Sequence, residues 1–572
     1  MGTVAENIIE TLSANGVERI HGLPGDSLNA VTEAIRAHES MEWVHVRHEE
    51  TAAFAAGAEA AMTGKLAVCV GSCGPGNLHL VNGLFDANRS RVPVLAIAAH
   101  IPTSEIGTSY FQETHPQELF RECSVYCEYV ATPEQMPRLL EVAIRAAVER
   151  RGVAVLVIPG DVSLADAVDE RVTVVEPTRS TTVPAPEQLQ QAAAVLNEAR
   201  RVTILGGAGT AGGVDQVLAV AERLGAPIVH ALRGKEYLDH NDHNVGMTGL
   251  LGFQSGYQAL CDADVLLMLG TDFPYTQFFP EDAAIVQVDI RGDHLGRRHP
   301  VQVGLVGGVR ETCEELLPLL DQKADKHLKR ALKNYEKSRA ELDDLAVPAP
   351  EGEPVHPPYL ARRINELAAQ DAVFIPDVGS PVVHAARHLQ MTGGRRLIGS
   401  FLHGSMANAL PQAIGVLAQD RSRQVIAMSG DGGLAMLLGD LLTLVQNDLP
   451  AKVVVFNNSS LNFVDLEMKA AGQLPFATDL ENPNFARVAE AMGIRGIRVE
   501  DSTGVDAALS EAFAHQGPAL VDVVVNAQEL TIPPTVEFAQ AKGFAIYSAK
   551  AVLSGRGDEL VSLAKSNLRH LF

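Results

Sequence analysis

The chain has 572 residues, which is too long for one ordinary hydrophobic core, and at about 150 residues per domain we expect three or four folded units. Hydrophobic residues make up 46% and charged residues 20%, a balance typical of folded globular proteins and not of disordered or fibrous ones. The formal net charge is -24 and no segment is rich in lysine and arginine, so nucleic acid is excluded as an expected partner.

The cysteine pattern and the N-terminal sequence indicate where the protein resides. The six cysteines are scattered without paired C-x-x-C spacing, which favours reduced thiols over a disulfide framework or a zinc site. Residues 1–20 carry Glu6, Glu10 and Glu18 in an amphipathic pattern unlike that of a signal peptide. No apolar run approaches the roughly 20 residues that a membrane-spanning helix needs. We therefore expect a cytoplasmic protein.

Short apolar runs rich in β-branched residues recur along the chain, each followed by a glycine-containing turn and a helical pattern. They are residues 66–70, 93–99, 153–158, 202–205, 265–269, 425–428, 453–456 and 520–525. Such runs are typical of strands buried on both faces by helices, as in parallel sheets. The sequence therefore predicts an α/β fold with parallel sheets.

Two proline-rich breaks divide the chain. Residues 183–186 read Val-Pro-Ala-Pro, and residues 347–358 hold five prolines among acidic residues. Extended segments of this kind suit domain boundaries because they make few packing contacts. We predict three α/β domains and a tail, at residues 1–182, 183–345, 355–530 and 531–572.

The strongest chemical signal is Gly430-Asp431-Gly432-Gly433 after a predicted strand, followed by Asn458 after the next strand. One strand-to-strand crossover spans the 27 positions between Asp431 and Asn458 and would bring both side chains to the carboxyl ends of neighbouring parallel strands. Oxygen ligands of this kind suit a magnesium ion that holds a diphosphate, which the glycines and the following helix would let approach. The alternative is an ordinary Gly-Asp turn. The paired spacing favours the metal site.

This arrangement resembles the thiamine diphosphate signature of the pyruvate oxidase, acetolactate synthase and pyruvate decarboxylase group. The resemblance implies that Asp431, the Asn458 side chain and the Ser460 carbonyl hold the metal. It also implies that the surrounding loops contact the cofactor through Gly432, Gly433, Ser459, Leu461, Asn462, Phe463 and Val464. Relatives usually have glycine at the position of Asn462. Asparagine is the next most tolerant residue of positive φ, so we expect the loop to persist there with altered detail.

A second signal is Glu49, at the start of the alanine-rich stretch 51–61. So many small residues suit a closely packed helix, which would bury a carboxylate near its start and raise its pKa, while the helix dipole acts in the opposite direction. By the resemblance, Glu49 bonds the pyrimidine ring and makes the neighbouring amino group the base that activates the cofactor. The alternative is a solvated surface acid, the commoner role of glutamate.

A third segment, residues 403–408, precedes an Ala/Leu-rich helical pattern. In relatives the matching glycine carbonyl accepts a hydrogen bond from the cofactor and a bulky side chain wedges the cofactor rings apart. Gly404 and Met406 match these two positions, with Ser405 between them in the cofactor-contacting loop. Met406 could equally be a core residue.

A glycine-rich turn at residues 71–77 opens a helix that bears His79, and glycine-rich turns at strand ends line clefts in such sheets. By resemblance, five residues would surround a bound 2-oxo acid, which we expect to be pyruvate: His79, Phe111, Gln112, Phe463 and Glu467. His79 taken alone could equally be a structural histidine.

The middle segment combines a G-x-G-x-x-G match at residues 207–212 with three further loops. The match alone is weak evidence for a dinucleotide. The three loops, however, resemble the flavin-contacting loops of bacterial pyruvate oxidases and imply FAD as a cofactor. They contain Thr248, Gly249, Leu250 and Leu251; Thr271, Asp272, Phe273, Pro274 and Tyr275; and Asp289. A flavin can accept the two electrons that oxidative decarboxylation releases. Acetolactate synthases also carry FAD, so the flavin site leaves both activities open.

The tail carries a helical stripe of Leu560, Leu563, Ala564, Leu568 and Leu571. The stripe suits binding at a membrane surface, although a terminal helix docked on its own protein is an equal alternative. Residues 553–560 resemble the tail of the quinone-dependent pyruvate oxidases of bacteria. That resemblance implies a tail that binds lipid when the flavin is reduced.

Together these patterns predict an enzyme that oxidises pyruvate to acetate and carbon dioxide with thiamine diphosphate, Mg²⁺ and FAD and passes the electrons to a membrane quinone. We expect a homotetramer that attaches to the inner face of the cell membrane when activated. Three alternatives stay open: a phosphate-dependent, oxygen-reducing pyruvate oxidase, an acetolactate synthase, and a noncatalytic cofactor-bound protein that interacts with membranes.

Overall fold

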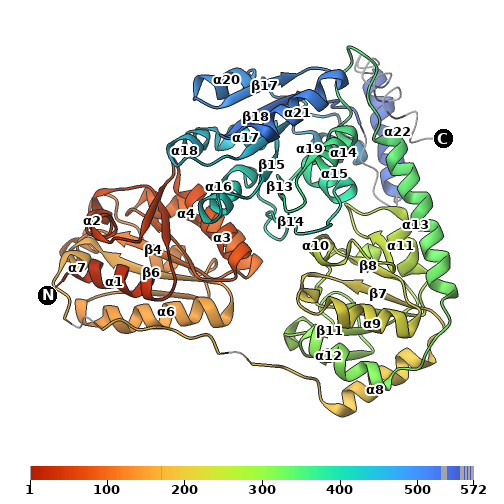
Figure 1. Cartoon of the computed structure of the whole chain (residues 1–572), viewed down its shortest axis with the longest axis horizontal. Coiled ribbons are helices and arrows are strands. Elements are labelled where there is room, and N and C mark those ends of the chain that lie inside the picture. The colour runs from red at the N-terminus through yellow and green to blue at the C-terminus, as the bar shows by residue number, and fades with distance from the viewer. Residues whose placement is uncertain are drawn as a thin grey trace.

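The computed structural model describes residues 2–168, 171–178, 180–529 and 538–553, together with residues 560, 563 and 567. Its architecture is three six-stranded sheets flanked by helices (Figure 1), and every strand pairing within these sheets is parallel. This confirms the predicted fold class. Each sheet lies within one of the three predicted domain ranges. Of the predicted tail stripe, Ala564, Leu568 and Leu571 lie outside the described residues, as does the segment 554–559.

The first sheet has the strand order β2-β1-β3-β4-β6-β5. Its strands are β1 (Arg19–Gly22), β2 (Glu42–His45), β3 (Ala67–Gly71), β4 (Val94–His100), β5 (Tyr126–Tyr129) and β6 (Val153–Pro159). The helices of this domain are α1 (Val4–Ala14), α2 (Asn29–Ala37), α3 (Glu49–Thr63), α4 (Pro75–Ser90), α5 (Pro116–Leu119), α6 (Met136–Arg150) and α7 (Gly160–Leu164).

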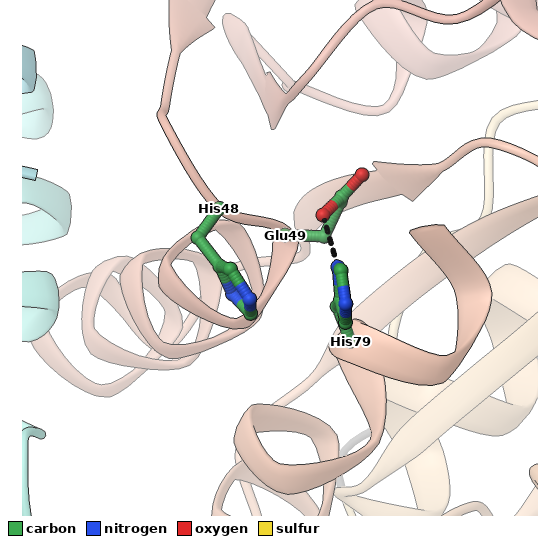
Figure 2. A group of neighbouring side chains, drawn as sticks. All are labelled: His48, Glu49 and His79. Carbon is green, nitrogen blue, oxygen red and sulfur yellow. Dashed lines mark hydrogen bonds and ion pairs between the residues drawn. The ribbon is translucent and has the colours of Figure 1, made fainter. Parts of the chain in front are cut away.

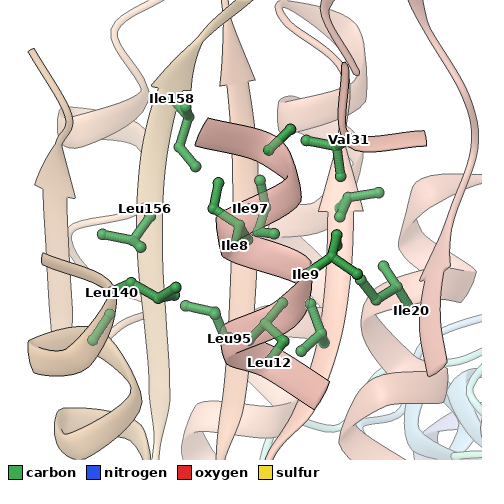
Figure 3. Packing of buried hydrophobic residues seen from close by; sticks show 14 of the residues in the cluster. Ile8, Ile9, Leu12, Ile20, Val31, Leu95, Ile97, Leu140, Leu156 and Ile158 are labelled. Carbon is green, nitrogen blue, oxygen red and sulfur yellow. The ribbon is translucent and has the colours of Figure 1, made fainter. Parts of the chain in front are cut away.

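Helix α1 shows how local sequence and packing agree in this domain. Thr3 and Glu6 form a capping box that satisfies two backbone amides at the start of the helix. Ile8 and Leu12 on the helix then pack against the apolar side chains of β4 and β6, as Figure 3 shows. Both side chains are fully buried, so the helix is held mainly by this apolar face.

The middle sheet has the order β12-β11-β10-β7-β8-β9. The chain first adds strands on one side of β7 and then, from β10 on, adds them on the other side. Its strands are β7 (Val202–Gly206), β8 (Ile228–His230), β9 (Asn244–Met247), β10 (Val265–Leu269), β11 (Ala284–Asp289) and β12 (Val303–Val306). Its helices are α8 (Pro186–Glu198), α9 (Val214–Leu224), α10 (Lys235–Leu238), α11 (Gln254–Cys261), α12 (Val309–Leu316) and α13 (Lys326–Leu345). This strand order is that of dinucleotide-binding sheets, whose ligands lie beyond the carboxyl ends of the strands.

The third sheet has the order β14-β13-β15-β16-β18-β17, the same relative order as the first sheet. Its strands are β13 (Val373–Pro376), β14 (Arg396–Leu397), β15 (Val425–Gly430), β16 (Lys452–Asn457), β17 (Arg495–Val499) and β18 (Ala519–Val524). Its helices are α14 (Pro357–Leu367), α15 (Ser380–His388), α16 (Ala409–Gln419), α17 (Asp431–Met436), α18 (Leu441–Gln446), α19 (Asn462–Ala470), α20 (Phe485–Ala491), α21 (Val505–Ala514) and α22 (Phe538–Leu553).

The first and third domains meet through the alanine-rich helix α3, which packs against α4 and α16. At Gly415 of α16 an added Cβ would lie 2.0 Å from the carbonyl oxygen of Ala55, so the two helices touch backbone to backbone. The predicted close packing of this helix is therefore present. No helix in the described part of the chain is both long and apolar enough to cross a bilayer.

Candidate active site

A cavity of about 380 Å³ lies at the carboxyl ends of the third sheet, where the strand order reverses between β13 and β15. Loops that follow β13, β15 and β16 form its walls. The middle domain closes another side with Leu232, Leu250, Leu251 and Tyr275. Parallel α/β sheets bind ligands at this topological position, so the cavity is the candidate binding site.

Asp431 and Asn458 meet at this edge as their spacing predicted. The Asp431 carboxylate accepts hydrogen bonds from the amides of Asn458 at 3.1 Å and Ser459 at 2.6 Å. Burial raises the pKa of the Asp431 carboxyl, although these hydrogen bonds lower it. A cation coordinated by the carboxylate would favour its charged form.

Several features of this cavity fit a divalent cation that holds a diphosphate. Asp431, Asn458 and Ser460 all line the cavity and offer carboxylate, amide and carbonyl oxygens, the ligands that Mg²⁺ prefers. The Ser460 hydroxyl is buried and has no hydrogen-bond partner among the described residues. At Gly433 an added Cβ would lie 2.4 Å from the Asp377 carboxylate, so only glycine lets the backbone pass this close to Asp377. Gly432, Leu461, Phe463 and Val464 complete this wall.

Asn462 adopts a different conformation from the one expected. Positive φ occurs at Ser459, at 55°, whereas Asn462 is absent from the positive-φ residues of the described chain and begins α19. Ser459 does not line the cavity. The expectation that Asn462 serves through its tolerance of positive φ is therefore wrong. Its side chain is instead buried and hydrogen-bonded to Ser380 and to the backbone of Ala527.

The segment after β14 presents Gly404 and Met406 to the cavity, as the resemblance implied. Gly404 has φ of +82°, a conformation that favours glycine. The Met406 side chain approaches Gly432 across the cavity, since a Cβ on that glycine would lie 3.4 Å from the methionine methyl carbon. Ser405 points elsewhere, because its hydroxyl accepts a hydrogen bond from Asn82 of the first domain at 2.8 Å.

Glu49 lies in the first domain, at the start of α3, and is 6% exposed. Its carboxylate bonds Nδ1 of His79 on α4 at 2.8 Å, and the His48 and His79 rings stack with centroids 4.2 Å apart (Figure 2). The three side chains are close enough to share a metal ion. The His48 ring nitrogen Nδ1 already accepts the amide of Glu50, which makes His48 the cap of α3. The cluster is thus a buried, hydrogen-bonded acid beside an imidazole.

The remaining predicted substrate residues fall on separate surfaces. Gln112 has φ of +62° and accepts a hydrogen bond from the Cys73 thiol at 3.2 Å, which places it beside the turn that cradles Glu49. Phe111 is 75% exposed. Phe463 lines the cavity, whereas Glu467 is exposed on α19. Within this chain, Glu49, His79, Phe111, Gln112 and Glu467 are not among the residues that line the cavity.

The predicted flavin loops surround the carboxyl ends of the middle sheet. Leu250, Leu251 and Tyr275 reach the cavity, and the other predicted loop residues are not among those that line it. Those other residues are Thr248, Thr271, Phe273 and Asp289, which are buried, Gly249 with φ of +95°, the exposed Pro274, and Asp272. Asp272 pairs with Arg297 and Arg298 at 3.3 and 3.2 Å. The loops after β9 and β10 thus approach the predicted cofactor residues of the third domain.

The G-x-G-x-x-G match has a structural explanation in this chain. The amides of Gly207 and Gly209 donate to the carbonyl oxygens of Leu269 and Gly270, both at 3.0 Å. An added Cβ at Gly209 would lie 2.6 Å from the backbone of Gly270. Close contact between two loops therefore accounts for these glycines without a bound dinucleotide.

Two residues near the metal site were missed by the sequence reasoning. Asn482 donates to the Asp431 carboxylate at 2.8 Å and fixes its orientation. Asp377 lies under Gly433, and burial raises the pKa of its carboxyl to about 7. The signal for Asp377 was present, because Asp377-Val378-Gly379 follows β13 as Asp431 follows β15. Asn482 lies in a loop without any repeating pattern, so nothing local marked it.

Comparison with known proteins relates this geometry to a family. Residues 2–119, 189–316 and 377–523 match the N-terminal TPP binding domain, the central domain and the C-terminal TPP binding domain of thiamine pyrophosphate enzymes. The YdaP protein of Bacillus subtilis (strain 168) is 36% identical over 100% of this chain and 99% of its own length. The pyruvate oxidase of Lactiplantibacillus plantarum is 29% identical over 91% of this chain and 88% of its own. The acetolactate synthase of Arthrospira platensis is 32% identical over 93% and 95%. The chain therefore belongs to the thiamine pyrophosphate enzyme family.

Proposed function

We propose that this thiamine diphosphate-dependent enzyme is a pyruvate:quinone oxidoreductase. Pyruvate and water would give acetate, carbon dioxide, two protons and two electrons, and the electrons would pass through FAD to a membrane quinone. The observation that carries the proposal is the shared cavity, in which Leu251 and Tyr275 of the middle domain face Asp431 and Met406 of the third. A flavin held by the middle-domain loops would lie next to the thiamine site, where electrons are released.

The residues of the cavity have distinct roles in this proposal. Asp431, Asn458 and the Ser460 carbonyl hold Mg²⁺, which binds the diphosphate. When bound, thiamine diphosphate would supply the nucleophile and the electron sink that decarboxylation of a 2-oxo acid requires. Gly404 and Met406 position the rings, and Phe463 contacts the bound 2-oxo acid.

Glu49 would reach the cavity of a second copy of the chain. It is buried beside His79 in the first domain, away from the cavity of its own chain. Leu78, which precedes His79 in the chain, is 50% exposed, Phe111, which precedes Gln112, is 75% exposed, and Val464 at the cavity is 42% exposed. Apolar surfaces of this kind suit an interface between subunits. We therefore propose that paired subunits complete each site, within the homotetramer expected from the sequence.

The C-terminal tail would connect the reaction to the membrane. Leu560 and Leu563 belong to its predicted apolar stripe, and a stripe of this kind binds at a bilayer surface. Lipid binding through the tail would bring the reduced flavin to quinone in the inner face of the cell membrane. In this proposal the enzyme is otherwise cytoplasmic.

An anaerobic flavin assay tests the proposal. The purified protein is mixed with thiamine diphosphate, Mg²⁺, FAD and pyruvate, and flavin absorbance is followed before and after quinone and lipid vesicles are added. We expect the flavin to bleach with pyruvate and to recover with quinone, faster when vesicles are present. A flavin that stays oxidised while pyruvate is consumed would contradict the redox assignment.

Two other activities stay as alternatives, because the chain is similar over most of its length to proteins named pyruvate oxidase and acetolactate synthase. Product analysis separates them from the proposal. Acetyl phosphate formed only with added phosphate would indicate the oxygen-reducing oxidase, and acetolactate would indicate carboligation. Acetate formed without phosphate supports the quinone-linked reaction.

A further inference from the structure

Asn462 connects the cofactor loop to a second part of the third domain. Its Oδ1 accepts a hydrogen bond from the Ser380 hydroxyl at 3.2 Å, and its Nδ2 donates to the carbonyl oxygen of Ala527. Both Ser380 and Asn462 line the cavity, and the asparagine is 7% exposed. One side chain thus bridges two walls of the thiamine site and a backbone that lies outside it.

Ala527 belongs to residues 526–529, which we call the strap. The strap follows β18 in the chain, and α22 is the next described helix, beginning at Phe538. Three further side chains hold it: Lys469 donates to the Gln528 side chain at 3.3 Å, Asn567 donates to the Gln528 carbonyl oxygen at 2.7 Å, and His356 bonds Glu529 at 2.8 Å. The strap is therefore held at three successive residues, and the hydrogen bond of Asn462 links it to the cofactor loop.

Helix α19 transmits the same connection further along the chain. It begins at Asn462, and near its other end the buried Lys469 lies 5.8 Å from the ring of Tyr547 on α22. Lys550 of α22 donates to the carbonyl oxygen of Gly472, just beyond α19, at 2.7 Å. Helices α19 and α22 pack together. Movement of the cofactor loop would therefore displace the groups that contact the strap and α22.

We propose that Asn462 is a positioning residue that ties the thiamine diphosphate loop, residues 458–462, to the strap. Ligand binding that orders the loop then stabilises the strap, and a docked strap favours ligand binding by the same factor, because such coupling is reciprocal. The tie rests on the loop holding thiamine diphosphate, as proposed above, and is independent of FAD and quinone.

Hydrogen exchange of the full-length protein, read by mass spectrometry, tests the tie. Saturating thiamine diphosphate and Mg²⁺ should slow exchange in residues 526–529 of the parent about fivefold, the factor that corresponds to one hydrogen bond of ordinary net strength. In Asn462→Ala calorimetry should show cofactor binding weakened about fivefold but not abolished, and at a saturating cofactor concentration protection of the strap should fall below about twofold. Equal protection in the parent and the variant, or none in the parent, would overturn the proposal.

Additional variants separate the tie from general loss of packing. Asn462→Asp keeps the acceptor for Ser380 but removes the donor to Ala527, so it should lose strap protection as Asn462→Ala does. Asn241→Ala is the matched control, because the Asn241 side chain also makes two hydrogen bonds, to the backbone of Leu238 and of His243, but lies in the middle domain. It should leave strap protection unchanged. If calorimetry shows no thiamine diphosphate binding by the parent, the proposed function fails; if the parent binds and the strap is unprotected, only the tie fails.

Discussion

Arg387, near the end of α15, donates from its guanidinium to the backbone carbonyl oxygen of Leu251 in the middle domain at 3.1 Å. A second bond from the same group reaches Gly252 at 3.0 Å. Helix α15 begins at Ser380 in the thiamine cavity, so this arginine fixes a predicted flavin loop against a wall of that site. Burial lowers the pKa of Arg387 to about 10, which leaves it charged at neutral pH.

Arg387→Met should loosen the loop at residues 248–252 and weaken binding of the proposed FAD. Hydrogen bonds from a charged group contribute about 1.5–3 kcal/mol each, so we expect FAD affinity to fall roughly tenfold or more. Flavin titration followed by fluorescence measures the change, and calorimetry checks that thiamine diphosphate affinity is preserved. Arg387→Lys retains the charge but has a single donor nitrogen, so its FAD affinity should lie between that of the parent and that of Arg387→Met. Unchanged FAD affinity in Arg387→Met would place the flavin elsewhere.

Asn482→Ala should weaken Mg²⁺ binding, because Asn482 orients the Asp431 carboxylate through its side-chain amide. Loss of a residue that orients a metal ligand reduces metal affinity about 10- to 100-fold. The measurement is the Mg²⁺ concentration that half-restores thiamine diphosphate binding after removal of metal by a chelator. Asn484→Ala is the matched control, since the Asn484 side chain caps α20 by accepting the amide of Arg487. Its loss should destabilise the helix by about 1 kcal/mol and leave Mg²⁺ affinity unchanged.

The sequence predicts the fold class and the meeting of Asp431 with Asn458. It does not predict the contacts made by irregular loops, for physical reasons. Apolar runs mark the strands because parallel strands are buried on both faces. The 27 positions between Asp431 and Asn458 predict their meeting because one crossover joins adjacent parallel strands. Asn482 could not be found this way, since its contact with Asp431 depends on the course of an irregular loop. Likewise, Gly207 and Gly209 allow two loops to pack closely, and a G-x-G-x-x-G motif looks the same whether its glycines serve loop packing or phosphate binding.

Asp86 should make stability depend on pH. It is buried on α4 and bonds Gln412 of the third domain at 3.1 Å, and burial raises the pKa of its carboxyl to about 6. The folded state therefore binds the proton more tightly than the unfolded state. The stabilisation is fully present below pH 4 and is lost as pH rises to about 6, by on the order of 3 kcal/mol.

Thermal melting at pH 4.5 and pH 7.5 measures this effect. The parent should lose stability relative to Asp86→Asn between the two values, because the amide stays neutral throughout. Asp264→Asn is the control, since Arg201 lowers the pKa of that carboxyl. Asp264 is ionised at both pH values, so its replacement should leave the difference between the two melting temperatures unchanged. A parallel pH response in the parent and Asp86→Asn would contradict the assignment.

Two inactive single variants, Glu49→Gln and Asp431→Ala, should regain activity when their subunits are mixed. Each variant alone should lose at least about a hundredfold in kcat, since one lacks the acid that activates the cofactor and the other lacks a metal ligand. If Glu49 acts on the cavity of a partner, a hybrid pair has one site with both native residues. Random pairing would then restore about one quarter of parental activity. Mixing Asp431→Ala with a doubly substituted subunit is the control and should restore none. Hybrids that form, as native mass spectrometry would show, but stay inactive would place both residues in the same chain's site.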